Sequence, residues 1–205
     1  DANDDALTND PAVSGIIQNT TGPITLRAGL NTDDENQFVD LSAVVEPDGS
    51  FTLDEPALRS LNADAPLPDG DYTLRFRALA DGGSSDLASV SFSLDRTPPQ
   101  LDVQTLAQGL NVNPTSRLQG SVETDADVTF QIGNGIETPL NFDPDTGAFD
   151  APLPVAGLGV GLFDFLLRAV DPAGNVRLRQ FGLNRTTFEV IAFSPDNGDT
   201  EVGAT

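Results

Sequence analysis

The side chains of this sequence that could do chemistry are almost all carboxylates. Of the 205 residues, 32 are acidic and 10 are basic, all ten basic residues are Arg, and there is no His, Cys, Met, Trp or Lys. Without His or Cys there is no Ser-His-Asp triad, no thiol nucleophile and no zinc site with the usual nitrogen and sulfur ligands. Without Lys there is no Schiff base and no P-loop lysine. A pair of carboxylates, as in a glycosidase, is the main catalytic route that is left.

The charge balance indicates which partners the chain can have. A formal net charge of -22 repels nucleic acid and anionic membranes, so neither is expected as a partner. No apolar run is long enough to span a bilayer, and membrane insertion is not expected. Of the 32 acids, 25 are Asp, the short carboxylate that is favoured in loops and in calcium sites. The acids predict either calcium binding or a solvated acidic surface.

Three stretches could supply oxygen ligands to a calcium ion. The candidate residues are Asp171 and Asn175 in the sequence DPAGN, Asp95 and Asp102 around the sequence DRTPP, and Asp33 and Asp34 in the sequence NTDDENQ. Each stretch has a plainer interpretation. The first could be a turn whose Asp and Asn bond their own backbone, the second a stiff proline linker, and the third an acidic loop whose side chains do not converge.

The elements that must position these loops are strands, and they occur twice. Residues 67–83 read LPDGDYTLRFRALADGG, and residues 159–175 read GVGLFDFLLRAVDPAGN. From Tyr72 and from Phe163 onward, apolar and polar residues alternate in the same register, which predicts a strand with one buried face.

Two further pairs of segments repeat in the same order. Residues 91–99 (SFSLDRTPP) match residues 180–188 (QFGLNRTTF), and residues 46–56 (EPDGSFTLDEP) match residues 143–153 (DPDTGAFDAPL). Three matched blocks, each displaced by roughly 90 to 100 residues, predict an internal duplication.

Each copy has the strand number of a Greek-key β-sandwich. Further strands are expected at 12–17, 24–30, 38–45, 101–106, 117–122 and 128–132, with one or two helical turns at 55–63. About seven short strands in some 90 residues, separated by Gly and Pro turns, is typical of such a sandwich. Tyr72 follows the turn PDGD and fits a tyrosine corner, in which its hydroxyl bonds back to the loop; Phe163 lacks that hydroxyl.

The sequence resembles the bacterial immunoglobulin-like tandem repeats of large surface and adhesin proteins. The residues that carry the resemblance read LPDGDYTLRFRALAD, LDRTPPQLDV and LRAVDPAGNVRLRQFGLNRT. It implies an all-β chain of two tandem Ig-like sandwiches at 11–97 and 98–187, after an acidic segment at 1–10. Residues 188–205 are expected to be either the first strand of a further, truncated repeat or an orphan strand that adds to the sheet edge of a neighbouring copy. The first copy departs from the pattern, because it has ADGGSSD where the second has VDPAGN.

The resemblance also implies a function. We expect a non-catalytic structural or adhesive repeat of a secreted or cell-surface protein, acting as a stiff spacer or fibre-forming unit that calcium rigidifies. Its partners would be adjacent repeats, further copies of the chain or a cell-surface ligand. The alternative is a spacer or carbohydrate-binding module of a secreted multidomain enzyme. Sugar-binding faces usually expose Trp or Tyr, and this chain has no Trp and a single Tyr.

Overall fold

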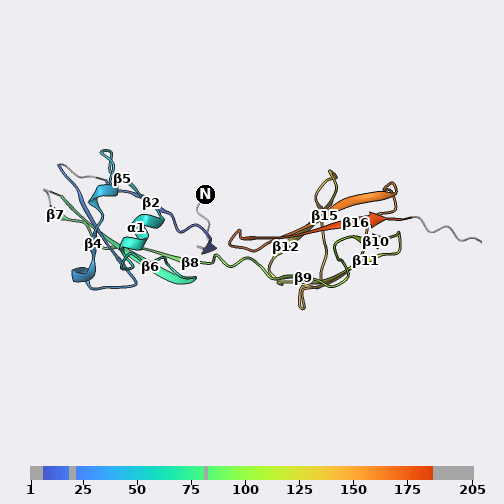
Figure 1. Ribbon diagram of the computed structural model, residues 1–205. Helices are drawn as coiled ribbons and strands as arrows, with labels where there is room; N and C mark the ends of the chain where they lie inside the picture. Colours follow the sequence, from blue (N-terminus) through green and yellow to red (C-terminus); the bar gives the residue numbers. More distant parts are fainter. Residues whose placement is uncertain (1–6, 19–21, 81–82, 187–205) are drawn as a thin grey trace, which may run out of the picture.

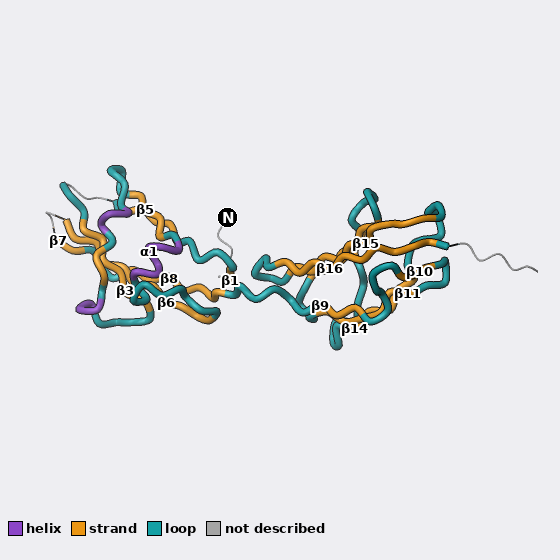
Figure 2. Tube along the Cα trace, in the orientation of Figure 1, coloured by secondary structure: helices purple, strands orange, loops and turns teal. Residues whose placement is uncertain are grey.

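The protein consists of two β-sandwiches that lie end to end, as the computed structural model shows (Figure 1). The structure describes residues 7–18, 22–80 and 83–186. Strands dominate both sandwiches, and the helical turns of the described residues all lie in the first (Figure 2). The two sandwiches are joined by residues 95–100, which we call the joint.

The first sandwich pairs a large sheet with a small one. The large sheet has the order β1-β8-β6-β3-β4, with β7 paired to β6, and the small sheet is β2-β5. Their bounds are β1 Leu7–Thr8, β2 Val13–Ile16, β3 Thr25–Leu30, β4 Val39–Asp40, β5 Ser50–Leu53, β6 Gly70–Ala80, β7 Gly83–Ser84 and β8 Ala88–Leu94. The short helix α1 (Glu55–Ser60) connects the two sheets between β5 and β6; it begins at its N-cap Asp54, which accepts a bond from the amide of Ala57.

The second sandwich repeats this plan. Its larger sheet has the order β10-β16-β15-β12-β13, and its smaller sheet has the order β14-β11-β9. Their bounds are β9 Leu101–Val103, β10 Leu110–Val112, β11 Arg117–Val122, β12 Asp127–Ile132, β13 Thr138–Pro139, β14 Ala148–Pro152, β15 Gly161–Val170 and β16 Val176–Arg185.

Apart from β7 and β9, each strand of one sandwich has a counterpart in the other, which confirms the tandem Ig-like fold that the sequence predicts. In both, a short strand pairs in parallel with the last strand (β1 with β8, β10 with β16), and the remaining ladders are antiparallel. A glycine of the small sheet faces a phenylalanine in each copy, since Gly15 is opposite Phe51 and Gly120 is opposite Phe149. β9 alone has no counterpart among the described residues of the first sandwich.

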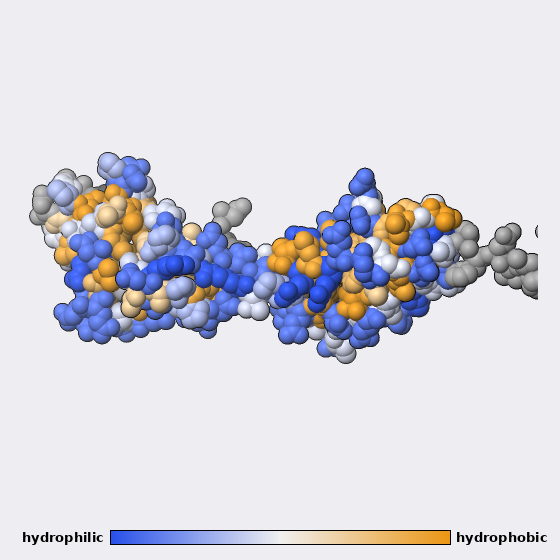
Figure 3. Space-filling model, in the orientation of Figure 1, coloured by the Kyte–Doolittle hydropathy of each residue, from blue (hydrophilic) through white to orange (hydrophobic). Residues whose placement is uncertain are grey.

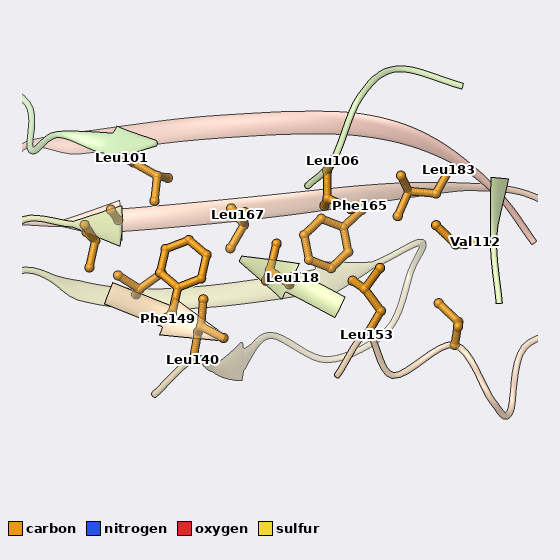
Figure 4. Packing of buried hydrophobic residues seen from close by; sticks show 14 of the residues in the cluster. Leu101, Leu106, Val112, Leu118, Leu140, Phe149, Leu153, Phe165, Leu167 and Leu183 are labelled. Atoms are coloured by element: carbon orange, nitrogen blue, oxygen red, sulfur yellow. The ribbon is translucent and has the colours of Figure 1, made fainter. Parts of the chain in front are cut away.

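Each sandwich closes its own hydrophobic core. One cluster of buried residues runs from Leu26 to Leu94, and a separate one runs from Leu101 to Leu183. In the second cluster the ring of Phe165 packs between the two sheets, with Leu118 and Leu153 beside it (Figure 4). Phe76 belongs to the first cluster and Phe165 to the second, so the two copies do not share an interior.

The strand alternation and the tyrosine corner are as expected. In β6 every second residue from Tyr72 to Ala78 is buried, and Phe165, Leu167 and Ala169 are buried in β15. The Tyr72 hydroxyl donates a bond to the carbonyl of Pro68 at 2.6 Å.

Three expectations about elements are wrong in detail. Residues 38–45 do not form one strand, because the chain leaves β4 after Asp40 and turns into a 3-10 helix at Ser42–Val44. The Asp40 carboxylate accepts the amide of Ser42 at the start of this turn. The strand expected at 101–106 ends at Val103. The match of 91–99 with 180–188 is two residues out of register, because Phe92 lies opposite Tyr72 whereas Leu183 lies opposite Phe163.

The domain boundaries at 11, 98 and 187 stay predictions. Leu7–Thr8, in the segment expected to precede the first sandwich, pairs with β8. The strand expected at 188–205 lies outside the described residues.

Candidate functional site at the interdomain joint

The joint is a short extended segment without strand pairing of its own. It begins after β8 ends at Leu94 and ends where β9 begins at Leu101. Pro98 and Pro99 follow each other within it, and Pro99 is fully buried. Because each proline fixes its own φ and restricts the residue before it, this segment has few backbone conformations available.

The first sandwich holds the joint through Asp69, in the turn before β6. One carboxylate oxygen, Oδ1, accepts the amide of Arg96 at 3.0 Å, and the other, Oδ2, accepts the hydroxyl of Thr97 at 2.7 Å. The Arg96 guanidinium also donates to the carbonyl of Leu67 at 3.2 Å. The start of the joint is thereby fixed to the loop that precedes the tyrosine corner.

These hydrogen bonds set the charge state of Asp69. The bond from the Thr97 hydroxyl, followed by that from the Arg96 amide, lowers the pKa of Asp69, while partial desolvation opposes the shift. Donors that bond the charged form favour it. Asp69 is therefore ionised at neutral pH and is a permanent double acceptor for the joint.

The second sandwich holds the joint through Asn175, in the turn between β15 and β16. The Nδ2 amide of Asn175 donates to the carbonyl of Asp95 at 2.9 Å and to Oδ2 of Asp171 at 2.9 Å. The backbone amide of Asn175 donates to Oδ1 of Asp171 at 2.8 Å. Asp171 and Asn175 are 9% and 8% exposed, so both are buried polar residues whose bonds satisfy each other.

Two more contacts tie the second sandwich to the joint. Arg177 Nε donates to the carbonyl of Pro99 at 3.3 Å, and Glu123 accepts the amide of Gln100 at 3.1 Å. The turn also comes close to the first sandwich, because a Cβ placed on Gly174 would lie 3.4 Å from Nδ2 of Asn9. The joint is thus bonded along its length by side chains of both sandwiches.

The six residues expected to bind calcium lie in three separate places. Asp171, Asn175 and the backbone of Asp95 meet at the joint, as described. Asp102 is an exposed residue of β9. Asp33 forms an ion pair with Arg75 at 2.7 Å, and Asp34 accepts the amide of Asn36 at 3.0 Å, a bond that lowers the pKa of Asp34.

This arrangement does not fit a calcium ion held by acidic side chains. A calcium ion takes about six to eight oxygen ligands. Across residues 7–18, 22–80 and 83–186, no three acidic side chains come close enough together to hold a metal ion. Calcium binding at the six residues stays a prediction.

Sequence reasoning missed Asp69 and Arg177 as parts of this site. Asp69 was assigned only to the turn before Tyr72, since nothing local indicates that its carboxylate reaches a segment 27 residues later. A signal for Arg177 was present, because Arg177 and Arg179 alternate in β16 on the face turned toward the joint and β9. Most of the groups that the joint contributes to these bonds are backbone amides and carbonyls.

Comparisons with known proteins give structural likenesses at low sequence identity. No family model matches the chain, and no curated protein matches it. Among solved structures, a tetra-tandem repeat from the extending region of a large adhesion protein is 19% identical, with a TM-score of 0.37 over 89% of this chain and 47% of that one. This chain therefore spans about half the length of that structure.

Two further structures are similar. The fibronectin(III)-like modules of Clostridium thermocellum CbhA are 11% identical, with a TM-score of 0.46 over 87% of this chain and 86% of that one. A Ca2+-stabilized adhesin, described as helping an Antarctic bacterium to reach out and bind ice, is 15% identical, with a TM-score of 0.34 over 88% of this chain and 45% of that one. The fold assignment rests on the strand order and pairing described above.

The described helices were compared with the length and apolarity that a membrane-spanning helix needs. In the part of the chain that the structure describes, no helix is long and apolar enough to cross a membrane.

Proposed function

We propose that this chain is a non-catalytic structural module of a bacterial extracellular or cell-surface protein, in which the two sandwiches act as a stiff spacer. The observation that carries the proposal is the joint, which is hydrogen-bonded to Asp69 on one side and to Asn175 and Arg177 on the other. A spacer needs a fixed angle between successive domains, and a bend within the joint would break the bond from Asn175 to the Asp95 carbonyl, which links the second sandwich to the start of the joint.

The proposed stiffness has two physical sources. Pro98 and Pro99 reduce the backbone freedom of the joint before any contact is made. The bond between Asn175 and the Asp95 carbonyl then selects one of the remaining conformations. It is buried at the Asn175 end, and leaving such a group unbonded costs about 1–3 kcal/mol.

The experiment that tests this proposal measures the distribution of distances between the sandwiches. The chain has no Cys, so the double variant Ala65→Cys with Ile136→Cys can carry two spin labels at exposed positions, one on each sandwich. Pulsed electron resonance should give a narrow distance distribution. Adding Asn175→Ala should broaden it, because the start of the joint then loses the bond between the Asp95 carbonyl and the second sandwich.

The control for this measurement is Asn113→Ala. Asn113 also bonds its own turn, through the amide of Thr115 at 2.8 Å, but it makes no contact with the joint. The control should leave the distances unchanged. A broad distribution in the parent chain would contradict stiffness, and an unchanged distribution in Asn175→Ala would contradict the role of the joint.

The proposal includes rigidification by calcium. The acidic composition of the sequence supports this part, whereas the geometry of the described residues does not. We expect millimolar calcium to raise the melting temperature more than sodium chloride does at the same ionic strength, and we expect EDTA to reverse the difference. An equal rise with both salts would assign the effect to charge screening and remove calcium from the account.

The same spacer role would serve a secreted multidomain enzyme as well as an adhesin, and the flanking domains decide between them. Carbohydrate binding has less support. The single Tyr of the chain is 9% exposed and bonded to Pro68, so its ring is not available for stacking on a sugar.

A further inference from the structure

The larger sheet of the second sandwich turns a partly apolar side away from the core. In β15 every second residue from Phe165 to Ala169 is buried, so the alternate residues point to the other side of the sheet. They are Leu162, Asp164, Leu166, Arg168 and Val170. In β16, Leu178 and Val176 lie on the same side and are 55% and 41% exposed. We call this side of β15 and β16 the outer face. Apolar side chains reach the surface of both sandwiches, but most of the visible surface is hydrophilic (Figure 3).

The matching face of the first sandwich is polar, and its arginines are paired within the chain. Arg75 and Arg77 of β6 form ion pairs with Asp33 at 2.7 Å and with Glu35 at 2.6 Å. A small polar residue of β8, Ser89, lies opposite Arg75. The charges of this face are therefore satisfied without a second molecule.

The outer face of the second sandwich has fewer charges and leaves them unpaired. In the register that the two long strands share, Leu166 stands at the place of Arg75, and Arg168 stands at the place of Arg77. Within the residues that the structure describes, neither the Arg168 guanidinium nor the Asp164 carboxylate makes an ion pair or a hydrogen bond. One basic and one acidic group are thus free on a partly apolar surface.

These two groups cannot satisfy each other within one copy. Asp164 and Arg168 are four residues apart on the same strand, which is a distance of roughly 13 Å. Glu137 lies in the neighbouring hairpin, but its carboxylate accepts the hydroxyl of Thr129, the residue opposite Arg168. Both free charges are therefore available to another molecule.

The order of residues along the outer face of β15 is self-complementary. Asp164 and Arg168 each lie two residues, or roughly 7 Å, from Leu166. When a second copy is turned about a two-fold axis above Leu166, its β15 runs antiparallel to the first. Each Arg168 then faces Asp164 of the other copy, and Val170 faces Leu162. Sheets that stack face to face are about 10 Å apart, a gap that an Arg and an Asp side chain span together.

We propose that two copies of this chain associate through their outer faces, about a two-fold axis at Leu166. A second copy fits because the symmetry of such a contact supplies an acid opposite each Arg168 and a guanidinium opposite each Asp164 at the same spacing. The charges also select the antiparallel arrangement. With the strands parallel, Arg168 would face Arg168 and Asp164 would face Asp164, and like charges in contact oppose association.

The size of the face indicates a weak contact. β15 and β16 have 10 residues each and β12 has 6, so the face is roughly 33 Å long and three strands, about 14 Å, wide. That is at the small end of specific protein interfaces. The proposal concerns the second sandwich alone, so it depends neither on a stiff joint nor on the proposed spacer role.

The net charge sets the conditions for observing the contact. Two chains that each carry -22 repel each other at low ionic strength. Salt screens this repulsion, whereas burial of apolar side chains is not weakened by it. We therefore expect self-association at high protein concentration in about 0.5 M sodium chloride, where the Debye length is only a few ångströms.

The test is sedimentation equilibrium of the full chain and of two charge-reversal variants, Arg168→Asp and Asp164→Arg. Alone, each variant places like charges together at both ends of the contact, so its association should be weaker than that of the parent by roughly a hundredfold or more. Mixed in equal amounts, the two variants restore opposite charges at both places, and the mixture should form a dimer of one copy of each. Together they carry the same total charge as two parent chains, so a recovery cannot come from a change in net charge.

Two further variants locate the contact. The control Arg117→Asp makes the same change of net charge as Arg168→Asp, but on the smaller sheet of the same sandwich, where the Arg117 side chain is 49% exposed. It should associate like the parent. Leu178→Asp places a charge among the apolar residues of the outer face, and it should weaken association of the parent chain.

Recovery in the mixture also separates loss of the contact from loss of folding, because it requires both variants to be folded. The chain that carries both reversals provides a second measurement. It restores opposite charges across the axis in a single molecule and should associate like the parent. A parent chain that stays monomeric at every concentration, reversal variants that associate as the parent does, or a mixture and a double variant that both stay monomeric would each overturn the proposal.

Discussion

At the scale of single residues, the two copies differ in how they hold equivalent corners. Tyr72 and Phe163 begin the same long strand, but only Tyr72 has a hydroxyl, and it bonds to the Pro68 carbonyl at 2.6 Å. Burial raises the pKa of Tyr72, so its phenol keeps its proton and donates it throughout the neutral range. The loop before β6 is therefore fixed by a bond that the loop before β15 lacks.

The substitution Tyr72→Phe tests this difference. It removes the hydroxyl and leaves the Pro68 carbonyl without that donor, so the first sandwich should lose about 1 kcal/mol of unfolding free energy. Amide hydrogen exchange can measure both sandwiches in one sample. Protection should fall in β6 and stay unchanged in β15, and equal losses in both would show that the effect is not local to the corner.

Asp69 gives a prediction about pH. Because its pKa is lower in the folded protein than the ordinary value of about 3.9, its contribution to stability is fully present above that value and is lost as the pH falls through the lower folded pKa. Asp69→Ala should lower the melting temperature at pH 7, and the gap between variant and parent should narrow below about pH 3.9.

The matched control for Asp69 is Asp71→Ala in the adjoining strand. Asp71 is an exposed carboxylate two residues after Asp69 in the sequence. Its melting temperature should differ little from that of the parent over the same pH range. A gap for Asp69→Ala that stays constant down to pH 2.5 would contradict the assignment of the effect to the ionised carboxylate.

At the scale of elements, a glycine turn positions the small sheet in each sandwich. Gly49 and Gly147 precede β5 and β14, with φ values of 86° and 70°. A Cβ on Gly147 would lie 1.8 Å from the carbonyl oxygen of Val122, so no side chain fits without moving β11. Turn geometry and the close approach of β11 both require glycine there.

Gly147→Ala should therefore lower the free energy of unfolding by more than the strain of a positive φ alone. That strain is about 1–2 kcal/mol, and the clash with Val122 adds to it. Gly109→Ala is the control, because Gly109 also has a positive φ of 76° but nothing lies within 4 Å of its Cβ position. Denaturant unfolding should show the larger loss for Gly147→Ala, and equal losses would mean that the backbone relaxes without cost.

The long strands could be predicted because their signal is local. In β6 and β15 the alternation of apolar residues is sufficient to give the strand and its buried face. Residues 38–45 have a similar pattern but leave the strand at Asp40, whose bond to Ser42 favours a turn over a ladder. The register of β16 depends on the length of the turn before it, which the repeated letters of the sequence do not indicate.

At the scale of the whole molecule, the net negative charge destabilises the folded state. Carboxylates exceed guanidiniums by 22 in a chain of 205 residues, and self-repulsion of this size destabilises a folded state. The ion pairs of the described residues, such as Arg77 with Glu35 at 2.6 Å, are partly exposed and offset little of it. Stability should therefore depend on ionic strength more than on any single pair.

The expected result is a melting temperature that rises with sodium chloride up to about 0.5 M and then changes little, because the Debye length has by then fallen to a few ångströms. A scan of salt concentration by calorimetry checks this. Sodium sulfate at matched ionic strength is the comparison, since any further rise there reflects strengthened apolar burial. A melting temperature that is independent of salt would contradict a role for charge repulsion.

The internal repeat of the sequence predicts the two sandwiches, but it does not predict the hydrogen bonds that hold the joint. The sequence DRTPP predicts a stiff segment, and Asp171 and Asn175 were among the expected site residues. The bond from the Asn175 side-chain amide to the Asp95 carbonyl spans 80 residues of sequence, and that pairing depends on how the two sandwiches meet. Contacts of this kind exist only once the tertiary structure is formed, so local patterns do not contain them.

The parallel pairing of β10 with β16 has a consequence for a chain under tension. The polypeptide enters the second sandwich at the joint and leaves after Arg185, so pulling its ends apart draws β10 toward the joint and β16 away from it. Leu110, Asn111 and Val112 pair with Leu183, Asn184 and Arg185, and in parallel neighbours pulled in opposite directions these pairs are sheared together rather than peeled one at a time. Rupture then requires several bonds to fail at once, which gives the sandwich a higher resistance to force than its small size would suggest.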